Sequence, residues 1–198
     1  FEAGLTVTSA GNFENSGNIT AYGVEIEATG DFTNSGSFIS ENGDISIKSA
    51  SFENAQSSEI SANSGKMTIF ATGDFTNAGK IDSSTGLLKI TAKSITTSGE
   101  INAQSGEFES TEAGIIFGEN SENTFEAGVT VTSAGNVEDD GAITASGIEI
   151  VAIGDFKNEG NFISENGDIS ITSANFESFG KIKLYSFGIS VADTSILL

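Results

Sequence analysis

The 198-residue sequence predicts an all-β fold, a right-handed parallel β-helix (β-solenoid) with three short strands in each coil. Three observations predict it: the chain repeats at a short period, apolar and polar residues alternate along each repeat, and glycines or Asn-Gly pairs separate the alternating runs. Alternation with period two is typical of half-buried strands, and strands this short bury a face only when successive repeats stack. Crossovers between parallel strands favour the right-handed form.

The repeat exists at two lengths. Residues 1–53 and 125–177 align without a gap at an offset of 124, and 39 of the 53 aligned positions are identical. Inside this block lies a shorter unit, seen in GVEIEATGDFTNSGSFISE at 23–41 and in GIEIVAIGDFKNEGNFISE at 147–165. Six such units fill 124 residues, which gives about 20–21 residues per coil and about 9.6 coils in the chain. Because stacked strands lie about 4.8 Å apart, we expect a rod roughly 46 Å long.

We expect residues 1–198 to form one solenoid segment of a longer array, since the chain begins in the middle of the pattern. Block one covers residues 1–124 and ends in an irregular junction coil at 105–124. Block two, residues 125–198, is a truncated second copy. A bulge or loop is expected in the junction coil, because Ser110 falls on an inward position and Phe117 replaces an asparagine of the repeat.

The alternation predicts three inward columns of side chains, one for each face of the coil. The first column contains Val7, Ile26, Ile47, Ile69, Ile90, Val131, Ile150 and Ile171. The second contains Phe13, Phe32, Phe52, Phe75, Ile95, Val137, Phe156 and Phe176. The third contains Ile19, Phe38, Ile60, Ile81, Ile101, Ile143, Phe162 and Ile182.

A row of asparagines follows the second column, two residues after each phenylalanine. Its members are Asn15, Asn34, Asn54, Asn77 and Asn158. Such a row could bind a ligand, or it could be a structural ladder in which stacked amides hydrogen-bond to one another. We favour the ladder, because a glycine follows two residues later in most coils and indicates a turn.

Composition excludes several kinds of chemistry. The chain has no His, Cys, Pro or Trp, all eight of its basic residues are Lys, and its net charge is −20. Disulfides, thiolate or imidazole metal sites and His-dependent nucleophiles are therefore excluded. A polyanion such as nucleic acid would repel the chain, and no apolar run reaches the 18 residues of a membrane span. We expect no catalytic residues and no cofactor.

Asp31, Asp74 and Asp155 of the GDF triplets are candidate calcium ligands, and we call them the GDF aspartates. Each precedes an inward phenylalanine and should point outward or cap a turn. Neither the calcium β-roll motif nor the EF-hand spacing occurs in the chain. We therefore expect diffuse screening of the acidic surface by divalent cations and no specific metal site.

The sequence suggests two other functions. Paired carboxylates can hydrolyse polysaccharides, and the junction coil carries Glu107, Glu109, Glu112, Glu119 and Glu122, but no basic residue is close in sequence and the coils look too uniform to form a cleft. Outward threonines such as Thr68 and Thr130 suggest an ice-binding face, but charged residues interrupt it.

The units AGNFENSGNITAYG, GDFTNSGSFISENGDISIKSA and GDFKNEGNFISENGDISITSA resemble the repeats of filamentous haemagglutinin-like exoproteins of two-partner secretion systems, which include adhesins and the stalks of contact-dependent inhibition toxins. The resemblance is clearest over 1–104 and 125–192. It implies a long extracellular β-helix on the surface of a Gram-negative bacterium. We therefore expect a non-enzymatic shaft or spacer, with adhesion to a glycan or protein of a host or neighbouring cell as an added role. The alternative is a filament subunit that stacks end to end with identical chains.

Overall fold

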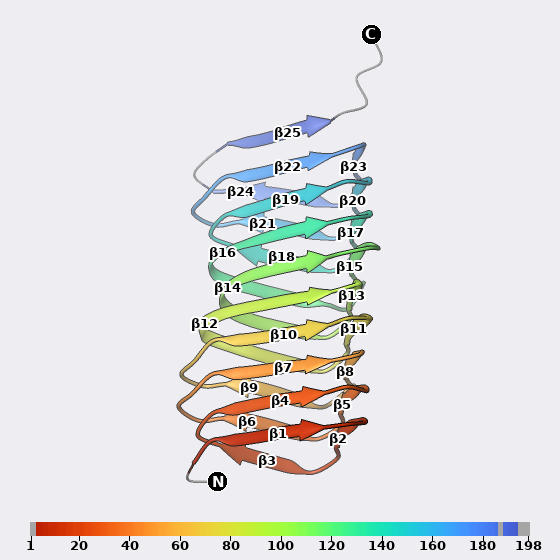
Figure 1. Ribbon diagram of the computed structural model, residues 1–198. Coiled ribbons are helices and arrows are strands. Elements are labelled where there is room, and N and C mark those ends of the chain that lie inside the picture. The colour runs from red at the N-terminus through yellow and green to blue at the C-terminus, as the bar shows by residue number, and fades with distance from the viewer. Residues whose placement is uncertain (1–2, 186–187, 194–198) are drawn as a thin grey trace.

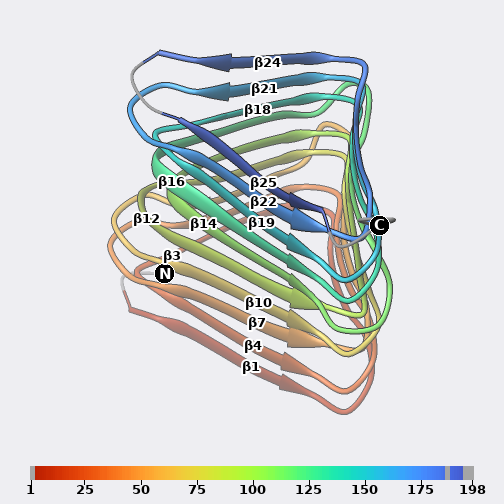
Figure 2. The same ribbon diagram turned by 90° about the horizontal axis from the view of Figure 1, so that it is seen from above.

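The computed structural model describes residues 3–185 and 188–193, and its regular structure in this part of the chain is entirely β-strand. The chain winds through about nine coils, and each coil runs once along three faces (Figure 1). Seen from above, the strands turn counter-clockwise as the chain rises toward the viewer (Figure 2), so the solenoid is right-handed. The predicted fold class is confirmed.

Every pairing between described strands is parallel and joins neighbouring coils. On the first face lie β1 (Leu5–Ser9), β4 (Val24–Ala28), β7 (Ile45–Ser49), β10 (Met67–Ala71), β19 (Ile148–Ala152), β22 (Ile169–Ser173) and β25 (Ile189–Asp193). On the second lie β2 (Phe13–Asn15), β5 (Phe32–Asn34), β8 (Phe52–Asn54), β11 (Asp74–Asn77), β13 (Ser94–Thr97), β15 (Ile115–Phe117), β17 (Val137–Asp139), β20 (Phe156–Asn158) and β23 (Phe176–Ser178). On the third lie β3 (Asn18–Ala21), β6 (Ser37–Ser40), β9 (Glu59–Ala62), β18 (Ala142–Ala145), β21 (Asn161–Ser164) and β24 (Lys181–Leu184).

Three longer strands turn the corner from the third face to the first: β12 (Lys80–Ala92), β14 (Glu100–Ser110) and β16 (Glu122–Ser133). They join these two faces into one 16-stranded sheet, while the second face is a separate 9-stranded sheet. The backbone stays paired around the corner because register shifts at Ser83/Leu87 and Ala103/Ser105 absorb the difference in corner length. The three predicted faces therefore form two sheets.

The interior consists of the three predicted columns. Their members from Ile26 to Ile171 are at most 1% exposed. Four rings of the second column stack almost parallel, with centroid separations of 5.3 Å for Phe13–Phe32, 5.0 Å for Phe32–Phe52 and 4.8 Å for Phe52–Phe75. In the junction coil Phe108 and Ile115 continue the first and second columns, but Asn123 occupies the third.

Glycine allows adjacent coils to approach closely at the corner between the second and third faces. No described glycine has a positive φ, so the left-handed conformation is not the reason for its presence. A Cβ added to Gly99 would lie 2.0 Å from the Gly79 carbonyl oxygen, and one added to Gly36 would lie 2.1 Å from that of Gly17. A larger residue at these positions would push the coils apart.

Candidate binding groove

The asparagine row lies at the corner where the second face meets the third, and its side chains point inward. Asn15 Nδ2 donates to Asn34 Oδ1 at 2.8 Å, Asn34 Nδ2 to Asn54 Oδ1 at 2.9 Å, and Asn54 Nδ2 to Asn77 Oδ1 at 2.9 Å. Asn77, the last amide of the row in block one, donates to Thr97 Oγ1 at 3.2 Å. Because each of these amides is at most 6% exposed, the row cannot reach a ligand outside the coil.

Two corners are longer than the others and make the surface uneven. In most coils the third-column residue comes four positions after the ladder residue, as Ile81 does after Asn77. In two coils it comes six positions later: Ile60 follows Asn54, and Asn123 follows Phe117. The two additional residues of each long corner form a tight turn, closed by Ser58 N–H to Ala55 O at 3.2 Å and by Ser121 N–H to Gly118 O at 2.8 Å. The long corners belong to coils three steps apart, which places them roughly 14 Å apart along the rod.

A groove of about 460 Å³ lies between these two corners. Ser57 and Asn120 wall it, and Gly79 and Gly99 lie in the short corners at its base. Ser57 has a φ of 66°, and no other non-glycine residue among those described has a positive φ. Conformations of this kind cost free energy and are concentrated at functional sites. We refer to this feature as the corner groove.

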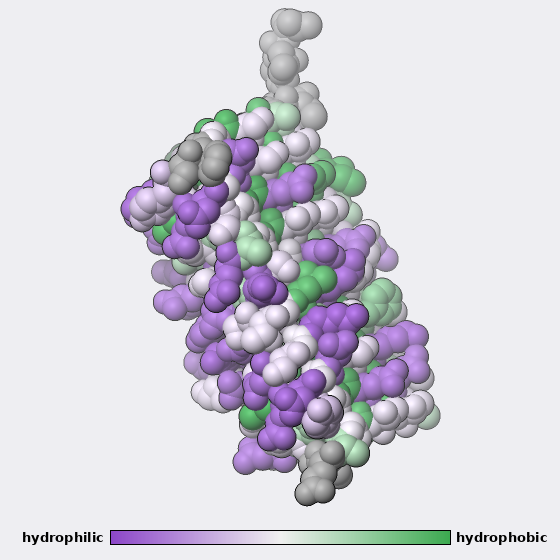
Figure 3. Space-filling view, turned by 90° about the vertical axis from the view of Figure 1, so that its left-hand side faces the viewer, coloured by the Kyte–Doolittle hydropathy of each residue, from purple (hydrophilic) through white to green (hydrophobic). Residues whose placement is uncertain are grey.

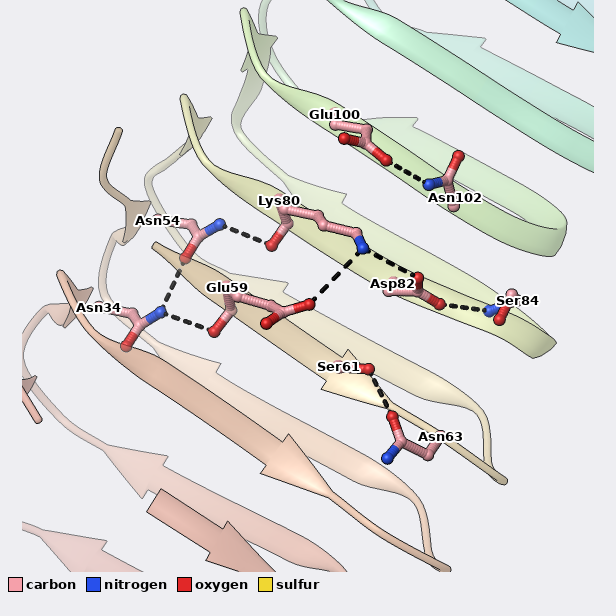
Figure 4. Close-up of polar contacts among 10 residues, drawn as sticks. All are labelled: Asn34, Asn54, Glu59, Ser61, Asn63, Lys80, Asp82, Ser84, Glu100 and Asn102. Carbon is pink, nitrogen blue, oxygen red and sulfur yellow. Dashed lines mark hydrogen bonds and ion pairs between the residues drawn. The ribbon is translucent and has the colours of Figure 1, made fainter. Parts of the chain in front are cut away.

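Charged side chains of the third face line one side of the corner groove. Lys80 Nζ lies 3.6 Å from Glu59 Oε1 in the preceding coil and 3.5 Å from Asp82 Oδ2 in its own strand (Figure 4). Glu100 occupies the same position one coil further on and accepts a hydrogen bond from Asn102. Desolvation opposes the charge of Lys80, but the carboxylates of Asp82, Glu59 and Glu100 outweigh it and raise the pKa of Lys80. The groove therefore presents one fixed cation in an acidic row.

The GDF aspartates are exposed on the outer corner between the first and second faces. Asp31 accepts a hydrogen bond from Ser51 Oγ at 2.6 Å, Asp74 from Ser94 Oγ at 2.7 Å, and Asp155 from Asn175 Nδ2 at 2.6 Å. These donors occupy the same slot in the next coil, so the GDF aspartates are separated from one another. Among the described residues no group of three or more acidic side chains could hold a metal ion. Diffuse cation screening stays a prediction.

The structure pairs glutamates of the junction coil with lysines of the coil before it. Glu107 Oε2 lies 3.0 Å from Lys89 Nζ, and Glu112 Oε2 lies 3.4 Å from Lys93 Nζ. Glu107 and Glu109 line one hollow beside Lys89, whereas Glu119 and Glu122 line another at the long corner, where Glu122 also borders the corner groove. The five glutamates therefore do not converge on one cleft.

Sequence reasoning missed the corner groove and the cross-coil ion pairs. The six-residue spacing at the two long corners is the signal that could have revealed the groove. It was missed because the coils were treated as uniform. The ion pairs depend on the register between coils, since their partners are 18 to 22 residues apart.

The side shown in Figure 3 carries many hydrophilic side chains with near-neutral ones and some hydrophobic ones among them. Large exposed hydrophobic side chains include Ile153 and Phe179. A rod of stacked parallel coils with cross-coil ion pairs and a groove walled by its own corners defines a β-solenoid repeat protein. The family model of the haemagglutinin repeat matches residues 2–36 and 38–176, and the chain belongs to this family. It is a family of structural, adhesin-like repeats whose members are typically secreted or surface-exposed. No curated protein and no solved structure matches the chain. None of the described residues belongs to a helix that could cross a membrane.

Proposed function

We propose that this chain is a non-enzymatic shaft segment of a secreted or cell-surface bacterial exoprotein, one that sets the distance between the bacterium and a distal functional part. The observation that carries the proposal is the continuity of the coil-to-coil pairing. The second-face sheet runs without a break from β2 to β23, and the interior columns run beside it. A structure of this kind gains length by adding coils without changing its cross-section.

The test is to lengthen the rod by one repeat block. Insertion of a second copy of residues 1–124 adds six coils, which corresponds to about 29 Å. Small-angle scattering should then show a longer maximum dimension with the same cross-sectional radius. A variant that grows in cross-section instead would contradict the shaft.

Adhesion is a second candidate function, and the corner groove favours it. The groove has built walls, a strained wall residue at Ser57 and a cation held by two carboxylates. A ligand with a carboxylate or sulfate group among hydroxyls, such as an acidic glycan, suits the single cation and the polar rim.

Binding to a panel of acidic and neutral glycans should be measured for the wild type, for Lys80→Gln, and for the matched control Lys48→Gln. Lys48 forms an ion pair with Glu27 at 2.8 Å on the first face, away from the groove. Loss of binding in both variants would indicate a general charge effect.

End-to-end association of identical chains is the alternative to a shaft within one chain. Sedimentation of residues 1–198 over a range of concentrations distinguishes the two, because filaments grow with concentration and a shaft segment does not.

A further inference from the structure

Among the described residues at the ladder position, one is ionisable. Asp139 stands at the position equivalent to Asn15, 124 residues earlier in the repeat. Asn15 is in the first coil and is 6% exposed, whereas Asp139 is 0% exposed. In the second-face sheet Asp139 pairs with Phe117 of the junction coil on one side and with Asn158 on the other. The second block therefore begins its ladder with a buried carboxyl group.

Three polar atoms at this step have no hydrogen-bond partner. Neither carboxyl oxygen of Asp139 has one, and neither does Oδ1 of Asn158. In block one the equivalent Oδ1 atoms accept from the amide of the preceding coil at 2.8 to 2.9 Å. Asn158 keeps the same orientation, since its Nδ2 donates onward to Ser178 Oγ at 3.0 Å. What is missing is a donor on Asp139.

A protonated carboxyl group supplies that donor, whereas an ionised one leaves a buried charge beside an acceptor. We propose that Asp139 is carried as the neutral acid, that its O–H donates to Asn158 Oδ1 and completes the ladder of block two, and that ionisation opens this step. The solenoid then contains a pH-sensitive contact at the start of its second block, strong in acid and weak in alkali.

The surroundings of Asp139 agree with this protonation state. The pKa of Asp139 is raised to about 7, because desolvation and the neighbouring Asp140 raise it by more than the backbone N–H of Gly141 lowers it. Glu138 is on the same strand, and Glu119 and Glu122 flank the corner of the coil below. Lys157, the cation on the coil above, forms an ion pair with Glu159, in which Nζ lies 2.6 Å from Oε1. Strands β18 and β21 carry no charged residue.

The sign of the pH effect follows from linkage. The pKa of Asp139 in the folded chain lies above its unfolded value, so the stabilisation is complete below the unfolded value of 3.8 and is lost as the pH rises through about 7. Between pH 5 and pH 8.5 this loss lowers the melting temperature of the 198-residue chain by about 5–10 °C.

The test compares residues 1–198 of the wild type with Asp139→Asn and with the control Asp155→Asn, at constant ionic strength. Asp155 is exposed and outside the ladder. We expect the melting temperature of the wild type and of Asp155→Asn to fall across this pH range, and that of Asp139→Asn to stay level, because an amide donates at every pH. The carboxyl ¹³C signal that disappears in Asp139→Asn should titrate near pH 7 in the wild type. A midpoint near 4, or an equal pH slope in wild type and Asp139→Asn, would overturn the proposal.

Discussion

The same substitution, glycine to alanine, should have opposite effects on stability at two equivalent corner positions of different coils. Gly99 and Gly17 both lie at the corner between the second and third faces, and neither has a positive φ. A Cβ at Gly99 would lie 2.0 Å from Gly79 O and 2.7 Å from Ala78 C, whereas a Cβ at Gly17 would have no atom within 4 Å. The added methyl group points toward the preceding coil, and Gly17 belongs to the first described coil.

The magnitudes follow from these contacts. Overpacking of a well-packed site costs about 1–3 kcal/mol. At Gly99 the coils must also separate, which weakens the hydrogen bond from Glu100 N–H to Gly79 O at 2.9 Å and adds about 1 kcal/mol. Gly99→Ala should therefore lower the free energy of unfolding by about 3 kcal/mol. Gly17→Ala should raise it by about 0.4–1 kcal/mol, because alanine restricts only the unfolded chain.

Thermal unfolding followed by far-ultraviolet circular dichroism measures both variants beside the wild type. A loss of about 3 kcal/mol corresponds to about 6–12 °C for a chain of this size. If the two variants melt within about 1 °C of each other, close approach of the coils is not the reason for glycine at this corner.

Three further outcomes are expected. Phe52→Ala removes a ring from the middle of the stack and should cost about 3–5 kcal/mol in urea unfolding, whereas Phe179→Ala, at a side chain that is 74% exposed, should cost less than about 0.5 kcal/mol; similar costs would refute the role of the stack. Calcium and magnesium should raise the melting temperature equally, also when the GDF aspartates are changed to asparagine, and a rise with calcium alone that these changes abolish would show a specific site. Phe117→Asn places an amide donor beside the carboxyl group of Asp139 and should lower the pH midpoint of the Asp139 ¹³C titration; an unchanged midpoint would contradict the register of the ladder.

The sequence predicted the interior well because two periodicities coincide in it. Alternation with period two decides which side chains point inward, and the repeat of about 20–21 residues decides which of them stack. Ile47, Ile69 and Ile90 could therefore be assigned to one column without any structure, and they pair in that register. The glycine positions were also predicted, as turn positions. The physical reason for glycine at these corners is the close approach of adjacent coils, which leaves no room for a Cβ.

The surface could not be predicted in the same way, because its contacts join residues a full coil apart. Lys48 and Glu27 are 21 positions apart and meet only through the exact alignment of β7 with β4. The corner groove likewise depends on where the two long corners fall relative to each other. Two additional residues in the corner of one coil leave the inward columns unchanged. They nevertheless decide which corner projects from the surface, and hence where the groove forms.

The junction coil shows how a solenoid tolerates departures from its repeat. A corner amide normally donates to a carbonyl at the start of the third-face strand in the next coil, as Asn34 does to Glu59 O at 3.2 Å and Asn54 to Lys80 O at 3.1 Å. Phe117 removes this amide, and the equivalent carbonyl is that of Ala142.

Asn123, which replaces an aliphatic residue in the third column, donates to Ala142 O at 3.1 Å. An aromatic ring thus stands where the amide was expected, and an amide stands where the aliphatic residue was expected, so the carbonyl keeps its donor. The exchange is incomplete, because Oδ1 of Asn123 has no partner and the ladder of block two must begin again at Asp139. The hydrogen-bond ladder that runs from Asn15 to Thr97 is therefore interrupted at the junction coil, where Phe117 takes the place of the amide.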